Sequence, residues 1–186
     1  MKKYISLLIF TVLFLNKNLI FAQSINLFGV KGGVNLMEIR DKLNDDSVAK
    51  ENKTGFYLGA FMEFRKSVNF SIQAEINYSG TNNKTNDQIG LLHIPVLFKY
   101  KVANKVEIYG GPESQFLLSV SRTDIKNKQY KKFILAADLG VGFLITEELT
   151  LDARYNLAVS NYMDFGPHRN KKLNFIQIGL AYKFDN

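Results

Sequence analysis

The chain has 186 residues, a formal net charge of +7 and no cysteine. This length suits a single domain, and the lack of cysteine excludes a disulfide framework, thiol chemistry and a lipid attached through cysteine. Three of the positive charges, Lys2, Lys3 and Lys17, lie close to the N-terminus. The remaining surplus is modest and does not indicate a nucleic-acid-binding protein.

The N-terminus is typical of a secretory signal peptide. Lys2 and Lys3 precede an apolar run over residues 4–15, and Ala22 stands before Gln23. The alternative is an uncleaved anchor helix, for which this run is short. We therefore expect a signal peptide at residues 1–22 and one domain at residues 23–186, with no helical membrane span in that domain.

An alternation of apolar and polar residues organises the rest of the chain. It is clearest over residues 149–160, where Leu151 and Tyr155 fall on one face and Asp152 and Arg154 on the other. Successive side chains of a strand point to opposite faces, so this segment has an apolar and a charged side. At roughly 3.3 Å per residue the segment spans about 40 Å, enough to cross a bilayer at a tilt. It is predicted to be a transmembrane strand.

The same pattern predicts eight strands, and no helical period competes with it. In chain order they cover residues 26–36, 55–65, 70–79, 89–100, 105–120, 133–145 and 149–160, and a last strand after residue 171 that ends at Phe184. Pro95 cannot donate a ladder hydrogen bond, so we expect a bulge or a local break in pairing there. Gly110, Gly111 and Pro112 predict a second irregularity.

Long and short connections alternate along the chain. The long ones cover residues 37–54, 80–88, 121–132 and 161–171, and the short ones cover residues 66–69, 101–104 and 146–148. This alternation is typical of outer-membrane barrels. We predict an all-β fold, an eight-stranded antiparallel up-and-down transmembrane β-barrel, with the long loops extracellular and both termini periplasmic.

A soluble lipocalin-type barrel is the alternative, with its apolar residues inside. Most strand glycines fall on the polar face, which favours a narrow, crowded polar interior and therefore lipid outside. The charges of that face nearly balance, as an interior set requires. The predicted interior charge network comprises Lys31, Glu63, Arg65, Glu75, Lys99, Glu107, Glu113, Asp138, Asp152, Arg154 and Lys183. We interpret it as structural, since eight strands leave no continuous aqueous lumen.

Several motifs resemble the outer-membrane β-barrel domain family of Gram-negative bacteria that is often labelled porin-family or PorT-like. They are GVKGGVN near the start, LLHIPVLFKY at 91–100, YGGPE at 109–113, LDARYNLAVSN at 151–161 and IQIGLAYKF at 176–184. The resemblance implies the barrel fold and an integral outer-membrane location. It implies little about activity, because these are scaffold motifs.

The sequence offers weak candidates for catalysis. His93 falls on the inward face and His168 in the last long loop, and either could pair with a serine and a carboxylate in a hydrolase or acyl-transfer site. No nucleophile motif accompanies them, so we interpret one as an interior hydrogen-bonding residue and the other as a solvated loop residue. Metal-ligand spacing and a phosphate-binding loop are missing too. We expect no enzyme activity and no cofactor.

The connection at residues 121–132 is a candidate extracellular contact loop, carrying Arg122, Lys126, Lys128, Lys131 and Lys132. These cations could attract anionic lipopolysaccharide or an extracellular partner; the alternative is a solvated loop. Expected partners are outer-membrane lipid, the barrel-assembly machinery and an envelope protein, with no nucleic acid. Three roles stay open: a structural, adhesive or envelope-integrity barrel, a PorT-like component of a secretion or assembly machine, and a lipid-modifying enzyme.

Overall fold

The computed structural model describes residues 26–42, 48–81, 88–120, 131–164 and 170–184. The predicted signal peptide lies outside them. The described residues form nine strands: β1 (Asn26–Lys42), β2 (Val48–Arg65), β3 (Phe70–Thr81), β4 (Ile89–Ala103), β5 (Val106–Val120), β6 (Phe133–Leu144), β7 (Leu149–Ala158), β8 (Met163–Asp164) and β9 (Asn170–Lys183). Among these residues no helix is long and apolar enough to cross a membrane.

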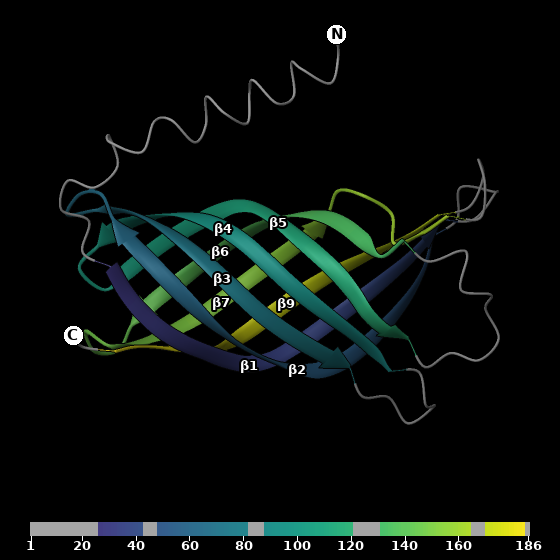
Figure 1. Ribbon diagram of the computed structural model, residues 1–186, viewed down its shortest axis with the longest axis horizontal. Coiled ribbons are helices and arrows are strands. Elements are labelled where there is room, and N and C mark those ends of the chain that lie inside the picture. The colour runs from purple at the N-terminus through teal and green to yellow at the C-terminus, as the bar shows by residue number, and fades with distance from the viewer. Residues whose placement is uncertain (1–25, 43–47, 82–87, 121–130, 165–169, 185–186) are drawn as a thin grey trace, which may run out of the picture.

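The strands form one closed antiparallel sheet (Figure 1). Each long strand pairs with the next, β7 pairs with β9, and β9 pairs with β1 from Gly29↔Lys183 to Lys42↔Asn170. The two-residue β8 is an addition beside β9. The predicted eight-stranded antiparallel barrel is therefore confirmed.

The apolar face points outward, as predicted. Phe56, Leu58, Leu139 and Val159 are among the many large apolar side chains exposed on the barrel wall. The outward positions between Phe28 and Leu36 carry no charge, and the same holds in the central part of every other long strand. A surface of this kind is stable in hydrocarbon and unstable in water. The soluble barrel is thereby excluded.

Strands β1 and β2 extend into the connection predicted at residues 37–54, which was too long. Their pairing continues from Leu36↔Thr54 to Lys42↔Val48. Over this extension Met37 and Ile39 are buried inside, while Glu38 lies on the outward face. The same alternate positions still point inward, but here the inward residues are apolar and the outward ones are polar. The reason is that the outward face leaves the lipid and meets water. The connections predicted at residues 80–88 and 161–171 also reach too far into the strands, since β3 ends at Thr81 and β9 begins at Asn170. The connection predicted at residues 121–132 agrees with the structure, in which β5 ends at Val120 and β6 begins at Phe133.

Tight turns join the strands at the opposite end of the barrel, where β1 begins and β9 ends (Figure 1). In the turn between β6 and β7, the Thr146 hydroxyl donates to a Glu148 carboxylate oxygen at 2.8 Å and accepts from the backbone N–H groups of Glu148 and Leu149. This hydrogen bond holds the pKa of Glu148 below its ordinary value. A short polar side chain thus fixes the direction in which the chain reverses.

The break expected at Pro95 occurs without a change of register. The β3–β4 ladder passes from Ala74↔Val96 directly to Asn77↔His93, and the residues between them do not pair across these two strands. The register shifts between β4 and β5 fall at Gly90/Leu91 and Lys101/Ala103 instead. The expected irregularity at residues 110–112 is limited to the β4 side, because the β6 ladder continues through all three residues.

Gly140 is required by the close approach of an aromatic ring. It lies opposite Tyr109, and a Cβ atom at Gly140 would stand 2.3 Å from Cζ of that ring. We expect Gly140→Ala to lower the free energy of unfolding by about 1–3 kcal/mol, because Tyr109 would be displaced and its hydrogen bond to Asp152 lost. Urea-induced unfolding in phospholipid vesicles measures this change.

Gly80→Ala is the matched control. A Cβ atom there would meet nothing closer than Tyr78 Oη, at 3.5 Å, which is an ordinary contact. Its effect on the free energy of unfolding should be small or slightly favourable. Equal stability of the two variants would contradict the assigned role of Tyr109.

Candidate functional site

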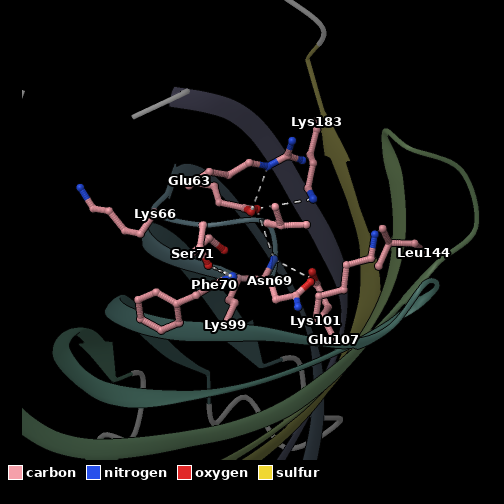
Figure 2. Close-up of a pocket in the computed structure, with 13 residues that line it drawn as sticks. Glu63, Lys66, Asn69, Phe70, Ser71, Lys99, Lys101, Glu107, Leu144 and Lys183 are labelled. Carbon is pink, nitrogen blue, oxygen red and sulfur yellow. Dashed lines mark hydrogen bonds and ion pairs between the residues drawn. The ribbon is translucent and has the colours of Figure 1, made fainter. Parts of the chain in front are cut away.

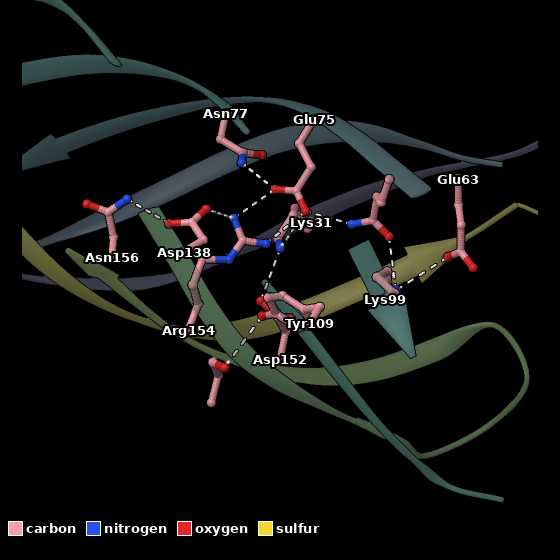
Figure 3. A network of polar contacts seen from close by, with 12 residues as sticks. Lys31, Glu63, Glu75, Asn77, Lys99, Tyr109, Asp138, Asp152, Arg154 and Asn156 are labelled. Carbon is pink, nitrogen blue, oxygen red and sulfur yellow. Dashed lines mark hydrogen bonds and ion pairs between the residues drawn. The ribbon is translucent and has the colours of Figure 1, made fainter. Parts of the chain in front are cut away.

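A network of buried ions crosses the middle of the barrel (Figure 3). Glu75 of β3 accepts from Arg154 of β7 at 2.8 and 3.0 Å, a two-pronged contact. Lys31 of β1 lies 3.4 Å from Glu75 and 3.0 Å from Asp152. Strands β3 and β7 stand on opposite walls of the barrel, so these contacts span its interior. Charge-assisted bonds of this kind offset the cost of burying each ion.

Polar neighbours complete this network. Asp138 accepts from Asn156 at 2.7 Å and lies 3.4 Å from Arg154. Tyr109 donates its hydroxyl to Asp152, and the guanidinium of Arg154 lies 5.2 Å from the centre of the Tyr109 ring. The centre of the barrel is thus occupied by paired side chains.

A second group of ions lies nearer the tight-turn end. Lys99 of β4 contacts Glu107 at 2.6 Å and Glu63 at 3.4 Å, and donates to Gln73 at 3.0 Å. Lys183 of β9 lies 3.5 Å from the same Glu63. The structure therefore places ten of the eleven predicted network residues in the interior. Arg65 differs: its side chain is about half exposed at the barrel mouth, 4.0 Å from Glu63.

His93 belongs to a buried chain of polar groups. Its Nε2 atom lies 2.7 Å from the Ser79 hydroxyl, and its Nδ1 atom lies 2.7 Å from Glu113. This order of hydroxyl, imidazole and carboxylate is the one that activates a serine nucleophile. Ser79 is 0% exposed, however, so no substrate carbonyl can reach it in this structure. The geometry agrees with an interior hydrogen-bonding role for His93.

Sequence reasoning missed Ser79, because only the register of β3 against β4 brings it to His93. The second histidine, His168, lies outside the described residues, as do Arg122, Lys126 and Lys128 of the predicted contact loop. Lys131 and Lys132 of that loop are described and exposed. No group of three metal-ligating side chains occurs within the described ranges.

An apolar cluster closes the barrel interior at the end with the long connections. Sequence reasoning also missed this cluster. Its residues lie at inward positions, and the inward positions in the rest of each strand are mostly polar. Its members are Met37, Ile39, Ile89, Leu91, Ile134, Tyr162, Met163, Leu173 and Phe175. Phe175 also meets the His93 ring edge-on at 5.4 Å, so the cluster covers the serine–histidine chain directly.

The described interior thus combines apolar closure at one end, paired ions in the middle and a basic mouth at the other. A profile of the outer membrane protein beta-barrel domain family matches residues 21–164, most of the chain. The chain belongs to this family. It is accordingly an integral β-barrel protein of the outer membrane, as the resemblance implied. No curated protein sequence matches the chain significantly.

Solved outer-membrane barrels are similar in fold at low sequence identity. Ail, the attachment invasion locus protein of Yersinia pestis, is 14% identical, with a TM-score of 0.50 over 86% of this chain and 99% of its own. Neisserial surface protein A is 16% identical, with a TM-score of 0.49 over 84% and 97%. OprG of Pseudomonas aeruginosa is 14% identical, with a TM-score of 0.48 over 89% and 99%. At these identities the likeness concerns the fold alone.

Removing one partner of the central ion network should destabilise the barrel. Arg154→Met would leave Glu75 with Lys31 as its remaining cation, and we expect the free energy of unfolding to fall by about 3–5 kcal/mol. Urea-induced unfolding in vesicles measures this free energy, and the folded fraction at each urea concentration is read from the heat-dependent shift of the protein band on a gel.

Arg40→Met serves as the matched control. Arg40 pairs with Glu38 on the water-facing extension of β1, where an ion pair contributes about 0–1 kcal/mol. If both variants lost the same stability, the buried network would not be the main electrostatic constraint on the fold.

Proposed function

We propose that this protein is a non-enzymatic barrel with a filled interior, which serves the outer membrane in a structural, adhesive or envelope-integrity role. One observation carries the proposal: the described interior holds cross-barrel ion pairs under an apolar cluster, which leaves no room for a diffusion path. A filled barrel acts through its surfaces. Solute transport is the activity that this filling disfavours.

The outer surface of the β1–β2 extension is the region best suited to contacts. It continues the barrel wall beyond the apolar belt, and Glu38 pairs there with both Arg40 and Lys50. A paired strand wall holds such charges in fixed positions, which favours recognition of a complementary surface. In this proposal the long connections and this extension are extracellular, and both termini are periplasmic.

The filled interior predicts a low conductance. Purified protein in planar lipid bilayers should give no large, stable open-channel currents, because Arg154, Glu75 and Asp138 block the centre of the barrel. Single-channel recording checks this expectation, with a known porin as the positive control. Regular openings of the size seen for a diffusion pore would refute the proposed filled state.

A lipid-modifying enzyme is the second candidate, favoured only by the Ser79–His93–Glu113 geometry. If the chain is structural, Ser79→Ala should leave the lipid A of cells that produce the protein unchanged compared with wild type. Mass spectrometry of extracted lipid A makes this measurement, with cells lacking the protein as the reference. A modification that depends on Ser79 would instead support the enzyme.

The PorT-like role in a secretion or assembly machine differs from both in requiring a stable protein partner. Affinity purification from cross-linked envelopes separates it from a self-sufficient barrel. Recovery of a defined envelope complex would favour the machine component.

A further inference from the structure

A cavity of about 530 Å³ opens at the tight-turn end of the barrel (Figure 2). The turn at residues 66–69 lies along its rim, and the ends of β4, β5 and β9 form other parts of its wall. This size lies in the range of small-molecule pockets. The central ion network lies further along the barrel interior, and the apolar cluster closes the opposite end of the barrel. The cavity is therefore a pocket entered from one side.

Cations outnumber carboxylates in the lining of this pocket. The cationic residues are Arg65, Lys66, Lys99, Lys101 and Lys183, and the carboxylates are Glu63 and Glu107. Three of the cations approach the same carboxylate, Glu63, at 3.4, 3.5 and 4.0 Å. The pocket therefore has an excess of positive charge that its own side chains do not neutralise.

Some side chains of this pocket point to its centre and others point away from it. Figure 2 shows Glu63, Lys99 and Lys183 converging at the centre, while Lys66 points away from them. Lys99 and Lys183 are buried, so their charges act in a region with little water to screen them. The buried carboxylates Glu63 and Glu107 balance these two buried charges. The excess therefore comes from Arg65, Lys66 and Lys101 at the mouth, where uncompensated positive charge attracts an anion.

We propose that this pocket binds a phosphate group. Ammonium and guanidinium groups are the side chains that bind phosphate best, since several N–H donors can reach its oxygens at once. The volume leaves room for part of the molecule that carries the phosphate. Two sources share this chemistry: a soluble phosphate compound, and the headgroup of a phospholipid in the adjacent leaflet. This site is independent of the adhesive role proposed above.

Calorimetric titration with inorganic phosphate tests the proposal. The barrel is folded in a maltoside detergent, which carries no phosphate of its own, at constant ionic strength. Wild-type protein should bind phosphate saturably. Arg65→Gln and Lys101→Gln, both at the rim, should each raise Kd by about tenfold. Lys183→Gln should do the same, and heat-dependent gel migration shows whether this buried variant still folds.

Lys172→Gln is the matched control, because it removes the same charge near the other end of β9. Its Kd should equal that of the wild type. If Lys172→Gln weakened phosphate binding as much as the pocket variants do, binding would respond to net charge alone, and the proposed site would be refuted. Vesicles then separate the sources: displacement of phosphate by phosphatidylglycerol, but not by phosphatidylcholine, identifies an anionic lipid headgroup. The proposal would be refuted if phosphate did not bind saturably in detergent and if phosphatidylglycerol and phosphatidylcholine vesicles had the same effect on phosphate binding.

Discussion

The hydrocarbon of a bilayer offers no hydrogen-bonding partner to a peptide group, and this constraint governs the structure. Every strand edge must be paired, so the sheet closes through β1 and β9. Because successive side chains alternate, closure with an apolar exterior directs every other residue into a narrow interior. Once charged residues occupy that interior, they must neutralise one another. The buried ion pairs thus follow from the same requirement as the exposed Phe56 and Leu58.

The ion pairs also connect strands that the sheet itself does not connect. Arg154 joins β7 to β3, and Lys31 joins β1 to both of them. Nearer the tight-turn end, Glu63 of β2 receives contacts from Lys99 of β4 and Lys183 of β9. These ties brace strands that are not neighbours in the sheet, and the Arg154–Glu75 contact spans the full diameter of the barrel. Backbone hydrogen bonds act only around its circumference.

The strands and their facing could be predicted because one periodic signal encodes both. Lys31, Glu75 and Arg154 were placed in the interior by counting along single strands. Their partners could not be assigned, since contacts across the barrel depend on strand number, tilt and register together. The proximity of Ser79 to His93 depends on register in the same way. Arg65 was placed too deep because counting along a strand gives the face of a residue but not its depth.

Prediction also failed where the surroundings change along one strand. At Met37 and Ile39 the apolar residues turn up at inward positions, and on β1 the outward position between them is charged. A method that looks for apolar residues at outward positions finds none here, and it therefore predicts a loop. The reversal itself marks where the strand leaves the lipid, which a single-period pattern cannot indicate.

The seam between β1 and β9 joins the first strand of the barrel to the last. The second edge of β1 is paired only by β9, so a growing polypeptide cannot close the barrel before β9 has been made. Closure of the barrel therefore comes after all of its long strands have been made. A chain that lost β9 would present two open edges at once, and we expect proteolysis or aggregation to remove it before it reached the membrane.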